Sequence, residues 1–345
     1  MSMLFFYIVL TLLVLTGIRY NKTGFVDGYL SKDTTNVIKG IFIILVFIKH
    51  ATPYVIRAGW HPNGLWGELF YFVDNNVGQW IVAMFLFYSG YGVMESIKHK
   101  GYDYVSQIPR KRVLTVLLNF DIAVLFFIVV NVCLGNQLSI RTCLLSFIGW
   151  ESVGNSNWYI FIIMILYLIT FISFYKAEAS TYKRPLVVFA IITFLMCIGL
   201  SFFKSEYWIN TMFCYVAGLI FSAYKDRLEK CAQRNYWATI IGILLLLFVL
   251  DYIPYSLRGF VYNSFAVVFC ALVVLGTMKF QVKNPILLWC GKNLFPLYIY
   301  QRIPMIVLSS IGGVFVAEHP VIFIVICLLV TILFAMLYKY IAIKL

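Results

Sequence analysis

The chain has 345 residues, of which 62% are hydrophobic and only 12% are charged, whereas soluble domains carry about 25% charged residues. This composition excludes a soluble globular protein, and the apolar runs that recur from end to end predict an all-α, polytopic integral membrane protein. The net charge of +13 does not indicate nucleic-acid binding, because the basic residues gather in alternate connections between the apolar runs.

Eleven apolar segments approach the roughly 20 residues that a helix needs to cross a bilayer. They are predicted near residues 4–18, 37–56, 78–97, 113–134, 158–175, 186–203, 207–224, 237–252, 259–278, 286–311 and 320–338. Twenty of the 27 Lys and Arg residues lie in one set of alternate connections. This bias predicts a cytoplasmic location for that set, with the N-terminus outside and the C-terminus in the cytoplasm.

The first apolar segment is expected to be a retained helix rather than a cleaved signal peptide. No basic residue precedes it and no small-residue cleavage site is evident. Further along, the outer connection 135–157 contains an apolar stretch, "RTCLLSFIGW", that is too short to span and is predicted to lie at the interface or to dip back. The eight scattered cysteines form no CxxC pair, so we expect packing residues rather than disulfides or a metal site.

The second segment, "IKGIFIILVFIKHATPY", carries Lys39 and His50 in an otherwise apolar run. Eleven residues of α-helix turn through about three full turns and rise about 16.5 Å, so both side chains project from one face. That rise is roughly half of the ~30 Å hydrocarbon thickness. With Lys39 at the cytoplasmic boundary, His50 is expected near the midplane.

An imidazole at that depth is expected to be neutral, since desolvation disfavours the charged form. A neutral imidazole can act as a general base toward a hydroxyl group. The alternative is a purely structural histidine that is hydrogen-bonded to a neighbouring helix. Lys49 lies 100° around the helix from His50 and is expected to snorkel, or to pair with an acid such as Glu68 or Asp74.

Together, five stretches in chain order resemble the acyltransferase-3 membrane family, the transmembrane O-acyltransferases of bacterial surface carbohydrates. "KGIFIILVFIKH" matches the family's basic-x10-His pattern, with Lys39 where arginine is commoner. The other four stretches are "FLFYSGYGVMESI", "PRKRVLTVLLNF", "NSNWYIFIIMILYLI" and "GKNLFPLYIYQRIPM". The resemblance implies a ten-helix acyltransferase core over residues 35–345, with an extra transmembrane helix and cytoplasmic linker at 1–34.

The resemblance also implies a set of site residues. His50 and Lys39 are the expected catalytic pair, and Lys39, Arg110, Lys111 and Arg112 the expected contacts for an anionic donor. Candidates for oxyanion or acceptor contacts are Ser89, Trp158, Gln301 and Arg302. The sequence departs from the family at Asn119, where proline is frequent, and at Gln301, where a histidine often lies.

In this family an acyl group, most often acetyl, passes from cytoplasmic acetyl-CoA to a hydroxyl of an extracytoplasmic acceptor. The implied location is the bacterial plasma membrane, the implied acceptor a surface polysaccharide, glycolipid or wall polymer, and no metal is expected. Neither the acceptor nor the oligomeric state is encoded in a motif. The sequence leaves open a transporter or flippase of a lipid-linked saccharide, a membrane O-acyltransferase of the other fold, and a family-derived sensor without activity.

Overall fold

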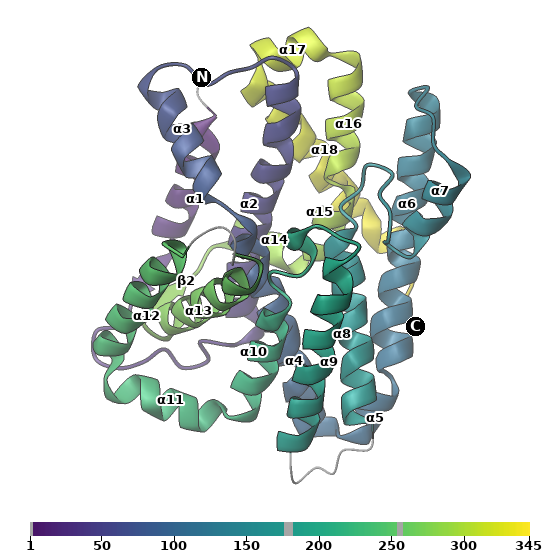
Figure 1. The fold of residues 1–345 in the computed structure, drawn as a ribbon. Coiled ribbons are helices and arrows are strands. Elements are labelled where there is room, and N and C mark those ends of the chain that lie inside the picture. Colours follow the sequence, from purple (N-terminus) through teal and green to yellow (C-terminus); the bar gives the residue numbers. More distant parts are fainter. Residues whose placement is uncertain (1–2, 176–181, 254–257) are drawn as a thin grey trace.

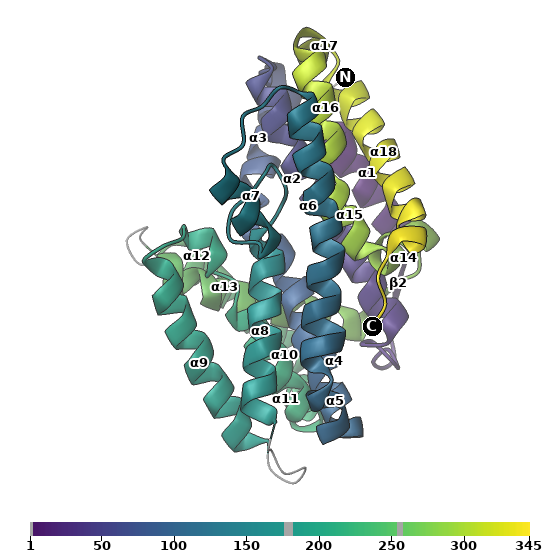
Figure 2. The ribbon, with the colours of Figure 1, turned by 90° about the vertical axis from the view of Figure 1, so that its right-hand side faces the viewer.

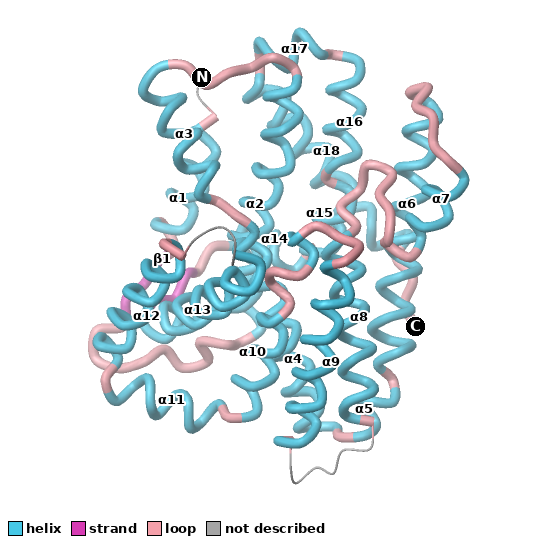
Figure 3. Tube along the Cα trace, viewed as in Figure 1, coloured by secondary structure: helices cyan, strands magenta, loops and turns pink. Residues whose placement is uncertain are grey.

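The structure is a computed structural model that describes residues 3–175, 182–253 and 258–345. The described residues are helical apart from connecting loops and one short antiparallel ribbon, in which β1 (Ile18–Tyr20) pairs with β2 (Phe280–Val282) (Figures 1 and 3). The prediction of an all-α polytopic membrane protein is confirmed.

Seven helical segments of the described chain are long and apolar enough to cross a membrane. Four of them are, or lie within, single helices: α2 (Lys32–Arg57), α9 (Lys183–Ser201), α13 (Arg258–Lys279) and α18 (Pro320–Ile341). Three are compound: a 3-10 turn (Gln79–Val82) leads into α4 (Ala83–Lys100), a π-helical turn (Pro109–Leu114) into α6 (Thr115–Cys133), and α15 (Leu294–Tyr300) into α16 (Arg302–Ile311).

An eighth span exists if α11 (Lys225–Arg234) and α12 (Tyr236–Asp251), which meet at 98°, are counted as one. Two shorter apolar helices, α1 (Leu4–Leu15) and α8 (Trp158–Phe174), correspond to further predicted segments. The segment predicted at 207–224 begins within a 3-10 turn (Glu206–Trp208) and then contains α10 (Phe213–Ala223). With 11 residues, α10 rises only about 16.5 Å.

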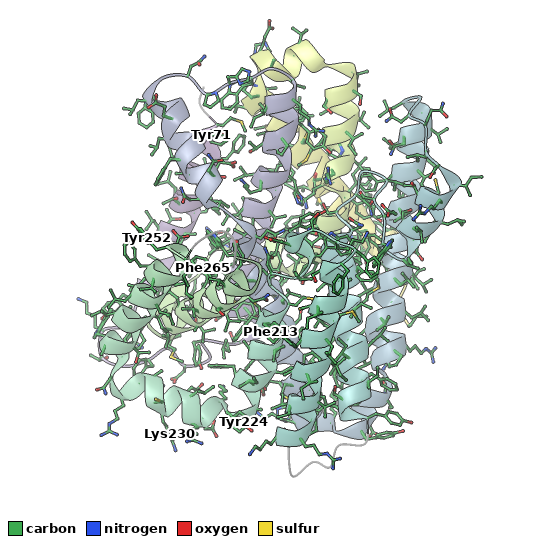
Figure 4. The ribbon with its side chains drawn as sticks, in the orientation of Figure 1. Tyr71, Phe213, Tyr224, Lys230, Tyr252 and Phe265 are labelled. Atoms are coloured by element: carbon green, nitrogen blue, oxygen red, sulfur yellow. The ribbon has the colours of Figure 1, made fainter. Side chains whose placement is uncertain are left out.

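The remaining helices are short. They are α3 (Gly64–Asn76), α5 (Tyr102–Ser106), α7 (Ile140–Phe147), α14 (Pro285–Lys292) and α17 (Gly313–Glu318). In Figures 1 and 2, α5 and α11 lie at one end of the molecule, and α3 and α17 lie at the other. The two basic connections 98–112 and 225–234 therefore lie at the same end, where Lys230 points away from the helices (Figure 4).

Helix α2 runs through the interior and is locked against α14 by two glycines. A Cβ atom on Gly40 would collide with the backbone carbonyl of Leu287, and one on Gly291 would collide with the carbonyl of Asn36. The two backbones can approach this closely only because both positions lack a side chain. This contact fixes the height of α2, and so of His50, relative to the segment that continues into α15.

We predict that Gly40→Ala destabilises the protein by about 1–3 kcal/mol, because the added methyl group has no space between the two backbones. Gly92→Ala on α4 is the matched control, since no atom lies within 4 Å of its Cβ position. Thermal unfolding of the purified proteins in detergent measures the difference. Equal losses in the two variants would contradict the proposed role of the α2–α14 contact.

Candidate active site

Helix α2 carries both residues of the basic-x10-His pattern. The Ser31 side chain caps the helix by accepting a hydrogen bond from the Thr34 N–H (3.3 Å), and the helix then continues without a break to Arg57. Lys39 and His50 are therefore on one rigid element, with three turns of helix between them. Lys39 is half-buried and has no hydrogen-bond or ion-pair partner within the described ranges.

The imidazole of His50 faces the junction between α15 and α16. Its ring centroid is 6.2 Å from that of Tyr298, and the side chains of Gln301 and Arg302 lie beside it. Gln301 is fully buried, and its Nε2 donates to the Tyr298 carbonyl (3.0 Å). One N–H of Gln301 is therefore still able to donate to a ligand.

Arg302 brings a positive charge next to the imidazole. Its Nε donates to the Tyr54 hydroxyl (3.2 Å), and its Nη1 approaches the Asn155 carbonyl (3.5 Å). The ion pairs of the described residues do not include Arg302. A guanidinium held by neutral partners is available to an anion or to a developing negative charge.

Buried polar atoms without a partner gather around His50. Within the part of the chain that the structure describes, they include His50 Nδ1, Asn155 Nδ2, Ser156 Oγ, Tyr298 Oη and Gln301 Oε1. Ser156 lies beside the Tyr298 hydroxyl, and Asn155 beside Arg302. Since buried polar groups are almost always paired in proteins, such a concentration indicates a place for substrate or water.

A narrow cavity of about 150 Å³ leads from this cluster toward the α5 end. Its lining includes Ser89, Tyr159, Tyr167 and Tyr298. The ring of Tyr159 packs on that of Tyr298, with centroids 5.4 Å apart, and Ser89 lies beside the hydroxyl groups of Tyr159 and Tyr167. Three tyrosine rings thus contribute to its lining, together with apolar side chains such as those of Ile160 and Leu294.

A larger cavity of about 610 Å³ lies at the basic end of the bundle. Its lining is rich in cations and comprises Lys100, Asp103, Tyr104, Gln107, Ile108, Lys111, Arg112, Thr115, Lys344 and Leu345. Lys344 reaches it because Asn119 binds the C-terminal segment in both directions: its Nδ2 donates to the Ile343 carbonyl and its Oδ1 accepts from the Ile343 N–H, each at 2.9 Å.

Arg112 connects the two cavities. Its Nε donates to the Tyr104 hydroxyl (3.2 Å) in the cationic cavity, and its charge interacts with Tyr167, which lines the aromatic cavity. Thr115 and Val116, consecutive residues of α6, each line one of the two cavities. A series of contacts therefore links the basic end of the molecule to His50.

The structure brings together some of the predicted site residues and separates others. His50, Gln301 and Arg302 form one cluster, and Lys111 and Arg112 line the cationic cavity. Lys39 and the exposed Arg110 are not among the residues that line this cavity. Trp158 packs on Tyr207 (centroids 6.1 Å apart), and it is the next residue, Tyr159, that contacts Tyr298.

Four residues near the candidate site were not predicted from the sequence: Tyr298, Asn155 and Ser156 in the His50 cluster, and Lys344 in the cationic cavity. Asn155 and Ser156 belong to the "NSN" stretch that precedes the Trp-Tyr pair, so their position in the outer connection was the available signal. Tyr298 lies three residues before Gln301, on the same face of a helix, and could have been found by that spacing. Within the described residues no three His, Cys, Asp or Glu side chains gather as a metal site would require.

Lys49 forms an ion pair with one of the two acids considered for it. Its Nζ lies 2.8 Å from Asp74 Oδ2 and also donates to the Asp74 carbonyl (2.7 Å). Asp74 accepts a further bond from the Tyr7 hydroxyl of α1 (2.7 Å). Lys49 therefore pairs with an acid rather than snorkelling. The resulting network joins α1, α2 and α3 one residue away from His50.

These features describe a membrane enzyme with a polar reaction centre enclosed among helices. A sequence profile of an acyltransferase domain matches residues 32–340, which is most of the chain. The chain therefore belongs to the acyltransferase 3 family, and it is a multi-pass membrane acyltransferase that uses an acyl donor. Searches among curated proteins and among solved structures found no match.

Asp74→Ala is expected to destabilise the protein by about 3 kcal/mol, because it leaves the Lys49 ammonium without its counter-ion and the Tyr7 hydroxyl without its acceptor. Glu68→Ala removes the other acid considered for Lys49, which is exposed, and should cost less than about 0.5 kcal/mol. Thermal unfolding in detergent compares the two. A larger loss for Glu68→Ala would show that the network is not as the structure has it.

Proposed function

We propose that this protein is a transmembrane O-acyltransferase that moves an acyl group, acetyl by the family resemblance, from cytoplasmic acyl-CoA to a hydroxyl of an extracytoplasmic carbohydrate. The observation that carries the proposal is the position of His50. Its unpaired Nδ1 lies beside Gln301 and Arg302, at the end of a series of contacts that begins in a cationic cavity.

The cationic cavity fits the charged end of coenzyme A. Lys100, Lys111, Arg112 and Lys344 surround it, and among the described residues that line it one side chain, that of Asp103, is acidic. Clustered cations bind phosphate groups through charge-assisted hydrogen bonds. The excess of basic residues at this end also supports a cytoplasmic location, where acyl-CoA is found.

The aromatic cavity suits the thin arm that carries the thioester. It is narrow, and its hydroxyl groups can bind the amides of such an arm, while the aromatic walls exclude water. From this cavity, contact with Tyr298 leads to His50. Lys39, half-buried and without a counter-ion in the described residues, offers a further positive charge on the same helix.

The chemistry follows from the groups around His50. The neutral imidazole accepts the proton of the acceptor hydroxyl as the oxygen attacks the thioester carbonyl. Gln301 Nε2 and the Arg302 guanidinium are placed to stabilise the oxyanion that develops. When the intermediate collapses, the carbon–sulfur bond breaks, and the imidazolium returns its proton to the leaving thiolate.

The acceptor is expected to approach from the opposite side. Asn155 and Ser156 belong to the connection predicted to be outside, and their unpaired amide and hydroxyl groups suit a carbohydrate. A surface polysaccharide, glycolipid or wall polymer of the bacterial envelope fits this orientation, with the protein in the plasma membrane and its N-terminus outside. Direct transfer through His50 as base requires no acyl-enzyme.

His50→Ala should lower the release of free thiol from acetyl-CoA by at least about 100-fold, because the general base is lost. The same variant should still bind free coenzyme A, since His50 lies away from the cationic cavity. Thiol release and calorimetric binding with the purified protein in nanodiscs measure the two effects. Turnover by His50→Ala at the native rate would refute the assignment of the base.

Replacing both Lys111 and Arg112 by alanine should weaken binding of coenzyme A by roughly 10- to 100-fold, as two charge-assisted contacts are lost. Arg110→Ala removes a neighbouring positive charge that does not line the cavity, and it is expected to change binding less than threefold. Calorimetry at fixed ionic strength compares them. Equal weakening in both variants would mean that only the general basic charge of this end matters.

A further inference from the structure

A second cavity, almost wholly apolar, lies at the side of the bundle and borders the His50 cluster at Gln301. It has a volume of about 150 Å³ and lies between α1, α2, α14, α15 and α18. We call it the α1 groove; its lining includes Phe6, Val9, Leu10 and Leu13 of α1, Ile43, Ile44, Phe47 and Ile48 of α2, Leu297 of α15, Gln301 at the α15–α16 junction, and Leu328 and Ile332 of α18.

The α1 groove ends at a polar group of the active site. Gln301 lines it, is fully buried, and keeps an unpaired Oε1. The same side chain lies beside the imidazole of His50. A ligand with its reacting carbonyl at His50 and Gln301 can therefore place an attached apolar chain directly in the groove.

The direction of the groove indicates whether such an apolar chain belongs to a lipid acceptor or to the acyl group. Its α2 residues, from Ile43 to Ile48, lie between the basic end of α2 and His50. An acceptor lipid with its sugar on the outer side would place its chain in the outer leaflet, beyond His50. A chain attached to the acyl carbonyl, in contrast, can turn from His50 into the groove.

Helix α1, which forms one wall, lies ahead of the residues that match the family domain. It is nevertheless held firmly, by the bond from Tyr7 to Asp74, by the bond from Asn284 Nδ2 to the Leu13 carbonyl (3.0 Å) and by the β1–β2 ribbon. These contacts join α1 to α3, to the residue before α14 and to β2, so the wall that α1 forms is attached to the rest of the fold.

We propose that the α1 groove binds the alkyl part of an acyl group longer than acetyl, and that this enzyme accepts medium-chain acyl-CoA. A dry cavity of about 150 Å³ holds a molecule the size of benzene, which corresponds to roughly six carbons. The proposal rests on the proposed function, and the transfer step is unchanged: the carbon–sulfur bond of the thioester breaks and an ester bond to the acceptor oxygen forms.

The first experiment measures thiol release from acetyl-CoA and hexanoyl-CoA by the protein in nanodiscs. Hexanoyl-CoA should have a kcat/KM at least roughly tenfold higher, because each methylene buried in the groove favours binding. Leu13→Trp, which fills the groove, should lower this ratio at least roughly tenfold. Leu12→Trp on the lipid-facing side of α1, where Leu12 is 54% exposed, is the control and should leave the ratio unchanged.

The second experiment does not depend on turnover. Hexanoyl-CoA with a diazirine at the chain end is bound to the His50→Ala variant, irradiated, and the labelled peptides are identified by mass spectrometry. Labels on α1 or α18 that free coenzyme A suppresses would support binding of the alkyl chain in the groove. If the protein showed no turnover at all, that result would count against the proposed function alone and would leave the labelling result standing. Labels elsewhere, or a ratio that Leu13→Trp leaves unchanged, would overturn the proposal and favour a bilayer lipid as the occupant.

Discussion

The cost of a polar group without a partner inside a membrane governs this structure. Lys49 of α2 is paired with Asp74, and Lys204, in the loop after α9, donates to the Trp150 carbonyl at 2.6 Å while lying over the Trp150 ring. The unpaired atoms around His50 are exceptions to this rule, and others, such as those of Asp121 and Thr193, lie elsewhere in the described residues. Under the proposed function, a substrate with matching groups would satisfy the atoms around His50 when it binds.

Under the proposed function, the same constraint gives the two substrates different approaches. The charged end of a phosphate-bearing donor would stay in the cationic cavity near α5, because it cannot enter an apolar bundle, and only a thin arm would pass the tyrosines. A carbohydrate acceptor would meet the neutral amide and hydroxyl groups of Asn155 and Ser156. His50 would then lie where the two approaches meet, away from bulk water.

The predictions that were correct follow from local rules. The placement of Lys39 and His50 on one face requires only the geometry of a single helix, and α2 has that geometry. The span expected at 286–311 instead divides at Asn293 and Gln301 into α14, α15 and α16, and Gln301 and Arg302, at the second junction, lie beside His50. Contacts such as that of Asn119 with Ile343, 224 residues apart, depend on the complete arrangement of helices, so Lys344 could not be assigned to the cationic cavity in advance.

Helix α1 shows how an element outside the matched domain can act on the chemistry inside it. Its Tyr7 completes the network of Asp74 and Lys49, one residue from His50, and its opposite end is fixed by Asn284. A helix that served only as an anchor would need no polar contact with the core, since apolar packing suffices in lipid. The bonds of α1 instead hold its apolar face at a set distance from α2 and α18, and that distance determines the width of the α1 groove beside Gln301.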